Sequence, residues 1–343
     1  MSNKKYDLIV YIGRFQPFSE HHKEIVRRAK QQAEYVQIIV GSAYTRRTTR
    51  NPLTYEERMS MIAEFLDKSP EINDKITVVP QRDRMYNDTK WAVDINDSIK
   101  RMVESIAADR GAYSLGVRDL KIGIIGHKKD EQTTHLDMFP QFDLIDVGYI
   151  DAPSATEIRT EIMSGILTGD AIESIKRELH VPYTVAKNLA KMYEDEMGYQ
   201  MDWGYGPFLT ADSIVQVGDH VLLIERGDTG DLALPGGFLN SSETFLEGAI
   251  RELKEETRLK VPVPVLKGSI KQRRVFDDPN RSTRARIITE AFHFHLINDT
   301  TLPEVRGSDD ARRAFWMPIA DLRDKEQLFF DDHYHILTFM LNI

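Results

Sequence analysis

The spacing of apolar and polar residues changes along the chain, and the first half follows one rule. Short apolar runs alternate there with longer segments that repeat apolar residues at helical intervals. We expect strands at 7–12, 35–41, 75–80, 120–126 and 142–148, and helices near 21–34, 54–66, 90–108 and 131–138. Thr54 and Glu57 form a capping box at the start of the second helix. Strands separated by helices predict βαβ units and an α/β domain with a doubly wound parallel sheet.

The second half has a different order of predicted helices and strands. Residues 169–196 predict two helices interrupted at Pro182, and a segment rich in glycine and aromatic residues follows at 195–207. Beyond it we expect two strands around a Gly-Asp turn in 208–227, a helix at 242–256, strands within 261–276 and 285–297, and a closing helix at 331–342. This pattern predicts an α+β domain with a mixed sheet between helices. We therefore expect two domains, 1–196 and 203–343, in agreement with a length of 343 residues.

Composition narrows the choice of protein class. The formal net charge of −9 argues against a dedicated nucleic-acid-binding protein. The chain contains no cysteine, which excludes disulfides and thiolate metal sites and fits a reducing cytoplasm. No apolar run reaches the ~18 residues of a membrane span, and the first apolar stretch is too short for a signal peptide. We expect a cytoplasmic protein that binds neither nucleic acid nor membrane, and the sequence leaves its oligomeric state open.

The decapeptide Gly-Arg-Phe-Gln-Pro-Phe-Ser-Glu-His-His places reactive side chains where the first strand meets a helix. Gly13 lets a phosphate approach the backbone, Arg14 offers a planar cation, and His22 stands in a helical first turn whose N–H groups favour anions. The stretch resembles the Gly-Arg-Phe-Gln-Pro-Phe-His-x-Gly-His signature of archaeal-type nicotinamide mononucleotide (NMN) adenylyltransferases, in the nucleotidyltransferase superfamily. Two positions depart from it and bear on rate and nucleotide placement: Ser19 replaces the first histidine and His21 replaces the glycine.

Further motifs continue this resemblance in the same order. Arg50, in an Arg-Asn-Pro segment, has the position that would reach a phosphate, with a solvated loop as the alternative. Trp91 stands where the family stacks nicotinamide, although a core tryptophan at a helix start would look the same. Ser154 and Thr156 would surround a phosphate at a helix N-terminus or simply cap that helix. The resemblance implies these substrate-binding residues: Gly13, Phe15, Gln16, Ser19, Trp91, Gly126, His127, Lys128, Asp130, Ser154 and Thr156.

The reaction that this resemblance implies is transfer of AMP from ATP to NMN, giving NAD and pyrophosphate. Because the attacking phosphate is already an anion, the enzyme needs alignment and charge neutralisation rather than a base. The resemblance assigns this work to His22, Arg14, Arg50 and Arg159, with Mg²⁺ on the phosphates. An adenylyltransferase for another acceptor, such as phosphopantetheine, is a rival interpretation that Trp91 and Arg50 disfavour.

The second half contains a helix crowded with carboxylates. Glu252, Glu255 and Glu256 are spaced by three and four positions, which places them on one helical face. Like charges repel there, and a divalent cation with oxygen ligands would resolve the repulsion. A solvated, charged helix face is the alternative interpretation.

The residues around this helix favour the metal site. Five residues separate Gly237 from Glu243, and seven more lead to Arg251, which can pair with Glu243 or Glu247 and orient the cluster. The complete spacing resembles the Nudix box of the Nudix hydrolases. Arg258 takes the place of the late glycine of the box, at a helix end where a positive φ is usual.

The Nudix resemblance implies hydrolysis of a pyrophosphate bond by metal-activated water, with Mg²⁺ or, in its place, Mn²⁺. It makes Glu252, Glu255 and Glu256 the metal ligands and gives the last two a catalytic role. The base is Asp309 or Asp310 in a late acidic turn, with a merely solvated turn as the alternative. Expected substrate contacts, including two from the basic segment 271–286, are Gly236, Gly237, Arg273, Arg284 and Asp310.

Together the two halves resemble the bacterial bifunctional NMN adenylyltransferase/Nudix hydrolase family, whose hydrolase half converts ADP-ribose to AMP and ribose 5-phosphate. The resemblance implies ATP, NMN and ADP-ribose as ligands. One alternative keeps one half as a nucleotide-binding sensor, which would be expected to lose its metal carboxylates and carry a basic DNA-binding helix. Another gives the Nudix half a different nucleoside diphosphate derivative, such as NADH.

Overall fold

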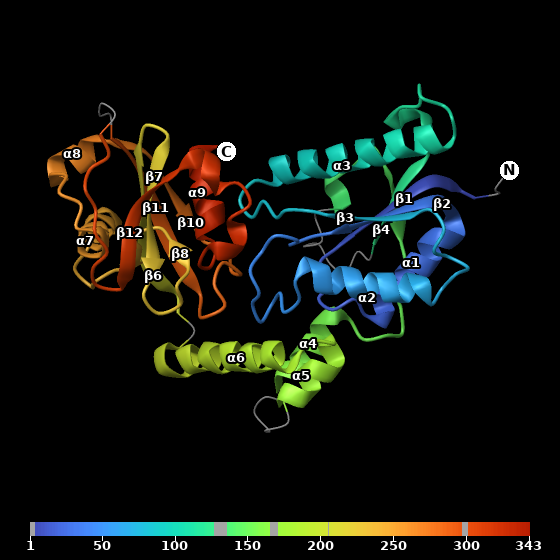
Figure 1. The fold of residues 1–343 in the computed structure, drawn as a ribbon, viewed down its shortest axis with the longest axis horizontal. Helices are drawn as coiled ribbons and strands as arrows, with labels where there is room; N and C mark the ends of the chain where they lie inside the picture. Colours follow the sequence, from blue (N-terminus) through green and yellow to red (C-terminus); the bar gives the residue numbers. More distant parts are fainter. Residues whose placement is uncertain (1–3, 127–135, 165–170, 205, 297–300) are drawn as a thin grey trace. The chain divides into compact units, whose positions relative to one another are not determined.

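The structure is a computed structural model that describes residues 4–126, 136–164, 171–204, 206–296 and 301–343. The chain divides into two compact units, Met1–Tyr193 and Glu194–Ile343, and each has its own sheet (Figure 1). Within the described ranges, no helix combines the length and the apolar character that crossing a membrane requires.

The first unit is built on a parallel sheet. Its strands are β1 (Tyr6–Gly13), β2 (Ala33–Val40), β3 (Ile76–Pro80), β4 (Ile122–Gly126) and β5 (Asp143–Asp146). Their spatial order is β3-β2-β1-β4-β5, and every neighbouring pair runs parallel. The chain therefore changes direction across the sheet between β1 and β4, and such a switch point opens a crevice at the carboxyl ends of the strands.

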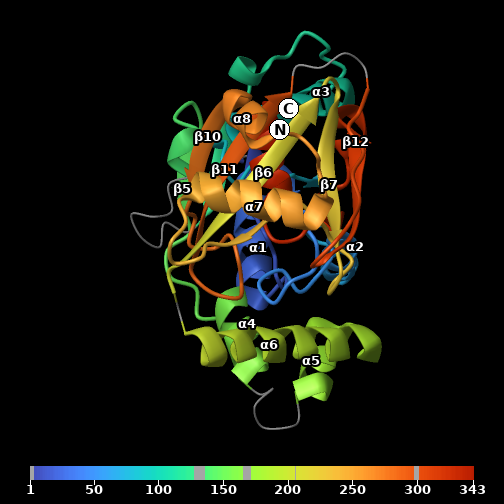
Figure 2. The same ribbon diagram turned by 90° about the vertical axis from the view of Figure 1, so that its left-hand side faces the viewer.

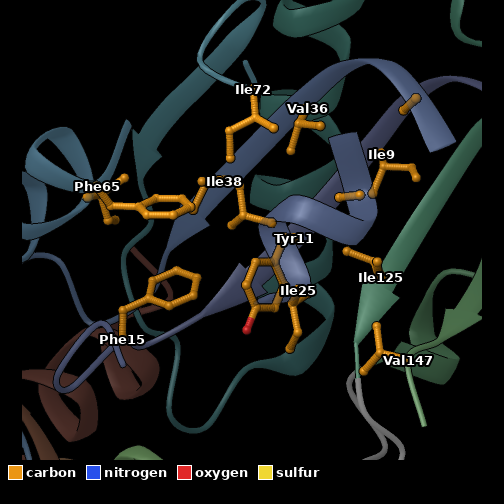
Figure 3. Close-up of a cluster of buried hydrophobic side chains, with 14 of the residues drawn as sticks. Ile9, Tyr11, Phe15, Ile25, Val36, Ile38, Phe65, Ile72, Ile125 and Val147 are labelled. Carbon is orange, nitrogen blue, oxygen red and sulfur yellow. The ribbon is translucent and has the colours of Figure 1, made fainter. Parts of the chain in front are cut away.

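Helices cover both faces of this sheet. The helices α1 (Glu20–Gln32) and α2 (Tyr55–Asp67) pack on one face and α3 (Asp88–Asp109) on the other (Figure 1). Alternate residues of β1 serve the two cores: Ile9 and Tyr11 join the α1–α2 core of Figure 3, whereas Leu8 and Val10 join the α3 core. The predicted doubly wound parallel sheet is confirmed, and so is the capping box at Thr54.

The first unit continues in α4 (Ala155–Ser164) and α5 (Ala171–Leu179), and α6 (Tyr183–Trp203) extends into the second. In its described part, the helix expected at 131–138 is only a 3₁₀ turn at Leu136–Met138. The second of the two helices expected in 169–196 runs further than predicted, because the segment from 195 is helical as far as Trp203. Tyr199 and Trp203 lie four positions apart, so their rings are neighbours on one face of the helix, with centroids 4.7 Å apart, and their contact stabilises its last turns. Gly204, at φ +78°, then ends the helix.

The second unit contains a mixed sheet. Its strands are β6 (Phe208–Val217), β7 (His220–Arg226), β8 (Leu232–Ala233), β9 (Gly236–Phe238), β10 (Ile270–Phe276), β11 (Ile287–Leu296) and β12 (Ala311–Pro318). The main order is β10-β11-β6-β7-β12, while β8 pairs with β7 and β9 with β6. The pair β11–β6 is parallel and the others are antiparallel, which confirms the predicted mixed sheet.

Helices α7 (Phe245–Thr257) and α9 (His333–Leu341) lie on opposite sides of this sheet, and α7 crosses its face in Figure 2. Ala249, Ile250 and Leu253 of α7 are buried in the core. The strand expected from residue 261 begins only at β10, because Pro262 starts the short helix α8 (Val263–Gly268). The strands β8 and β9 were not predicted because they have only two and three residues, and β12 was not predicted because its residues were assigned to the late loop of the Nudix resemblance.

Candidate active sites

One cavity at the carboxyl edge of the first sheet gathers most of the predicted residues of this unit. It measures about 230 Å³. The neighbouring strands β1 and β4 end there, and the helices α1 and α4 begin there. The predicted residues that line it are Gly13, Arg14, Phe15, Gln16, His22, Gly126, Ser154, Thr156 and Arg159.

Guanidinium groups give this cavity its positive charge. Burial, with a smaller contribution from the nearby cations Arg14 and Arg50, lowers the pKa of Arg159 to about 10. Burial also lowers the pKa of Arg14, and Arg50 adds to this effect. Arg159 donates hydrogen bonds to the Gln16 carbonyl and, at 3.2 Å, to the Thr156 hydroxyl. The three arginines are thus close enough to repel one another, and an anionic ligand would relieve that repulsion.

His22 is held by its own helix cap. The backbone N–H of Ser19 donates to His22 Nδ1 at 3.0 Å, and the Ser19 hydroxyl lies 3.0 Å from the same nitrogen. A ring nitrogen that accepts from a backbone N–H carries no proton, so the proton of His22 resides on Nε2. Phe18 stacks on the ring with centroids 5.9 Å apart, and Phe15 meets its edge at 5.1 Å. Ser19, which is buried, therefore orients His22.

Phe15 and Gln16 line the cavity, but their side chains are each only 1 % exposed. The Gln16 amide donates to Leu53 O at 2.8 Å and accepts from Leu53 N at 2.8 Å. It thereby joins the loop after β1 to the segment before α2. A Cβ added at Gly13 would lie 2.8 Å from the Phe15 ring, so packing alone requires glycine there.

Arg58 ends the segment 41–58 that resembles the adenylyltransferase family, but the sequence interpretation gave it no role. It is 1 % exposed, and burial lowers its pKa to about 10. Its guanidinium donates to Arg14 O at 2.6 Å, Gly41 O at 2.7 Å, Ser42 O at 2.9 Å and Thr54 O at 3.1 Å. It therefore ties the loops after β1 and β2 to the start of α2. The family pattern includes this arginine, but its burial could not be predicted, since an arginine in the first turns of a helix is usually exposed.

Other predicted residues are placed differently. Trp91, in the first turn of α3, packs on Phe139 with centroids 5.9 Å apart in the α3 core, and it is not among the residues that line the cavity. Ser154 accepts from Glu157 N at 3.3 Å, so it caps α4 while it lines the cavity. Outside the described ranges lie His127, Lys128 and Asp130.

In the second unit, salt bridges arrange the α7 carboxylates. Arg251 Nε donates to Glu243 at 2.6 Å, and its Nη1 contacts Glu252 at 2.8 Å and Glu255 at 2.9 Å. Glu247 instead accepts a hydrogen bond from Thr244 N at 3.0 Å in the helix cap. Of the two glutamates that the sequence offered to Arg251, the one that it contacts is therefore Glu243. This settles the alternative that the sequence left open. Within the described residues, no three acidic, histidine or cysteine side chains already converge as they do around a metal ion.

Glu256 is the most buried of these glutamates, at 4 % exposed. It accepts a hydrogen bond from Gly236 N at 2.9 Å. Burial raises its pKa to about 8, and the neighbouring Glu252 contributes to the rise. Burial also raises the pKa of Glu252, with Glu255 and Asp309 contributing. The helix thus presents closely spaced carboxylates that repel one another, as the spacing predicted.

The Gly-Gly turn is set by close approach to this cluster. A Cβ added at Gly237 would lie 2.6 Å from Glu252 Oε1, and one at Gly236 would lie 2.3 Å from Asp212 Oδ1. Asp212, which is buried, accepts from Thr289 Oγ1 at 2.6 Å. Both glycines are therefore needed because carboxylates pass directly over the turn.

The predicted residues Asp309, Asp310 and Arg273 differ in their contacts. Asp309, at φ +55°, is close enough to Glu252 to affect its pKa. The carbonyl of Asp310 accepts from Gly227 N at 2.8 Å. Arg273 is 64 % exposed at its side chain and pairs with Glu290 at 3.3 Å. The described contacts therefore favour Asp309 over Asp310 as a neighbour of the cluster.

Arg284 lies by the same aromatic ring as Arg226. Its guanidinium pairs with Asp331 at 3.1 Å and lies 4.7 Å from the Phe330 centroid. Arg226 lies over the same ring at 4.2 Å and is close enough to Glu256 to lower its pKa. Arg226 and Asp212 were not predicted, because nothing in their strands marks them.

Comparison with known proteins finds relatives for both units. The "Cytidylyltransferase-like" family model matches residues 10–139 and the "NUDIX domain" model matches 207–338. A nicotinamide/nicotinic acid mononucleotide adenylyltransferase of Acinetobacter baylyi is 36 % identical over 163 residues, which are 47 % of this chain and 78 % of the relative. An ADP-ribose pyrophosphatase of Methanocaldococcus jannaschii is 34 % identical over 137 residues, or 39 % of this chain and 73 % of the relative.

One solved structure resembles both units at once. The bifunctional NMN adenylyltransferase/ADP-ribose pyrophosphatase of Francisella tularensis, complexed with AMP and a manganese ion, matches with a TM-score of 0.81 and 28 % identity. The match covers 98 % of this chain and 99 % of that one. The chain belongs to the bifunctional NMN adenylyltransferase/ADP-ribose pyrophosphatase family. The family resemblance drawn from the sequence motifs is thus confirmed.

A member of this family needs a divalent metal in its Nudix unit, and the residues of α7 fit one. Glu252, Glu255 and Glu256 offer only oxygen donors, which suit hard cations such as Mg²⁺ and Mn²⁺. Burial is the main cause of the raised pKa values of Glu252 and Glu256, neighbouring carboxylates add to it, and a bound cation would offset both effects. The helix end also fits the box, because Arg258 adopts the expected left-handed conformation at φ +54°.

Proposed function

We propose that the first unit transfers AMP from ATP to NMN and that the second hydrolyses ADP-ribose to AMP and ribose 5-phosphate. The observation that carries the first assignment is the meeting of Arg14, His22 and Arg159 in one cavity at the strand ends. The second rests on the α7 carboxylates packed against the Gly-Gly turn. A cytoplasmic location stays a prediction from the composition.

In the first unit, an oxygen of the NMN phosphate attacks the α-phosphorus of ATP. The bond from this phosphorus to the bridging oxygen breaks, and pyrophosphate leaves with the electron pair. Arg14, Arg50 and Arg159 neutralise the phosphates, and His22 donates its Nε2 proton in a hydrogen bond to a phosphate oxygen. The Ser19 contact supports this role because it fixes the proton on Nε2. Trp91 stays a candidate for stacking nicotinamide.

In the second unit, water attacks a phosphorus of the diphosphate, and the bond to the bridging oxygen breaks. Glu252, Glu255 and Glu256 would hold the metal, and Asp309 is our candidate to accept the proton of the water. When bound, Mg²⁺ or Mn²⁺ supplies charge neutralisation on the diphosphate and a lower pKa for the attacking water. Arg251 contacts Glu252 and Glu255 and would keep them aligned, and we assign Arg226 and Arg284, which lie by the Phe330 ring, to the substrate phosphates.

The alternatives are weaker. A nucleotide sensor has no need of three metal carboxylates, which are all kept here on one helix. The choice between ADP-ribose and another nucleoside diphosphate derivative rests on family membership and requires a comparison of substrates.

Separate loss of the two activities tests the two-site proposal. E255Q and E256Q should abolish metal-dependent hydrolysis of ADP-ribose and leave NAD synthesis at the wild-type rate. R14A and H22A should have the opposite effect. Equal damage to both activities by either set, in variants that remain folded, would contradict the proposal.

A further inference from the structure

The adenylyltransferase cavity contains a second imidazole. His21 lines it together with His22, Arg14 and Arg159. The two histidine rings are nearly perpendicular, at 89°, with centroids 5.9 Å apart. Adjacent residues at a helix start therefore present two differently oriented imidazole edges to one space with a positive rim.

Ser19 does not offer its hydroxyl to a ligand in this cavity. Its hydroxyl and its N–H both lie at 3.0 Å from His22 Nδ1, and the residue is 6 % exposed. Ser19 is thus a positioning residue for His22. A ligand that enters the cavity meets the imidazole of His21 rather than the serine hydroxyl.

A polyphosphate chain matches this arrangement. His21 is the second residue of α1, beside N–H groups that point toward the helix N-terminus and favour anions. An imidazole can donate a hydrogen bond to a phosphate oxygen, and two imidazoles whose ring centroids lie 5.9 Å apart can donate to different phosphates of one chain. We propose that His21 binds the β- and γ-phosphates of ATP, the pair released as pyrophosphate, as a further catalytic residue of the first unit. This inference rests on the proposed adenylyltransferase function of the same cavity.

The main rival explanation is steric. A ring at position 21 could merely narrow the cavity, and its removal would then leave the reaction unchanged or faster. A binding role predicts the opposite sign, since a hydrogen bond to a charged ligand is worth about tenfold or more in affinity.

The test compares H21A and H21N with wild type and with Q31A, an exposed position near the other end of α1. Initial rates of NAD formation give kcat/KM for ATP and KM for NMN, and added pyrophosphate gives its inhibition constant. We expect H21A to lower kcat/KM for ATP at least about tenfold and to weaken pyrophosphate inhibition similarly, with KM for NMN within about twofold. H21N keeps a donor and should retain more of both.

Some outcomes overturn the inference. H21A kinetics within about twofold of wild type, or faster, would leave His21 a bystander or an obstacle. A loss confined to KM for NMN would assign His21 to the other substrate. If H21A melts at a lower temperature than Q31A, the H21N values decide. A wild-type protein that forms no NAD would instead contradict the proposed function itself.

Discussion

Removal of the Arg58 guanidinium should destabilise the loop that carries Arg14, because that loop loses a hydrogen bond from Arg58. The proposed change is R58M, which keeps a long side chain in the buried space but leaves the carbonyls without their donor. Of the four carbonyls that Arg58 meets, Thr54 O keeps the helical N–H of residue 58 and Ser42 O keeps the Thr45 hydroxyl at 3.1 Å. Arg14 O and Gly41 O lose their described side-chain donor.

An unsatisfied buried carbonyl costs about 1–3 kcal/mol, so two give roughly 2–6 kcal/mol. The change also removes the cost of burying a guanidinium, so we expect the first unit to lose about 3 kcal/mol of unfolding free energy. Adenylyltransferase kcat/KM should fall at least about tenfold because Arg14 shifts, while ADP-ribose hydrolysis stays unchanged. The chain has three tryptophans, so a W203F/W316F background leaves Trp91 to report urea unfolding of the first unit.

The matched control is K68M, whose ion pair with Glu64 lies at the surface near the end of the same helix. An exposed pair contributes little, so this variant should stay within about 0.5 kcal/mol of its parent. A cost for R58M no larger than that of K68M, or an equal loss in the hydrolase, would refute the reasoning.

Three further predictions concern the Nudix unit. G237A should lower ADP-ribose hydrolysis at least about tenfold without affecting NAD synthesis. The added Cβ would lie only 2.6 Å from Glu252 Oε1 and would therefore displace that carboxylate. An unchanged rate of hydrolysis would contradict the assignment of Glu252 as a metal ligand. R258G should raise the urea-unfolding free energy of this unit by about 1 kcal/mol, because it relieves a left-handed residue at φ +54°, and a lower stability would count against this. Mg²⁺ should bind more weakly as the pH falls below about 8, since Glu256, with its raised pKa, must first lose a proton. Without metal, the raised pKa of Glu256 makes the unfolding free energy fall as the pH rises from the ordinary glutamate range through about 8. The rise in Tm that Mg²⁺ causes should therefore be larger at pH 8.5 than at pH 6.5. Equal rises at the two pH values would contradict this.

Most of the fold could be predicted because its signals are local. The alternation of apolar strands with helices predicted the parallel sheet, and each strand of the first unit forms within a few residues of its predicted position. The predictions failed where a long-range contact or a turn residue decided the local structure. The helix α6 runs past its predicted end at residue 196 to Trp203, whose ring meets Phe208 and Phe238, and Pro262 starts α8 where a strand was expected.

The candidate sites divide in the same way. Motif spacing along one helix placed Glu252, Glu255 and Glu256 on one face, since helical geometry follows directly from residue number. The partners of Arg251 required the structure, because Glu243 and Glu247 are both within reach in the sequence and only the helix cap assigns Glu247 elsewhere.

The sequence alone determined two domains, their secondary structure and the motifs that point to adenylyl transfer and diphosphate hydrolysis. Tertiary structure decided which of these residues meet: Arg159 reaches the Gln16 carbonyl across 143 positions of sequence, and Arg58 is buried under the Arg14 loop. It also placed His21 in the cavity and Trp91 beside Phe139. The physical reason is that periodicity fixes the face on which a side chain lies, whereas the order and register of the strands fix its neighbours.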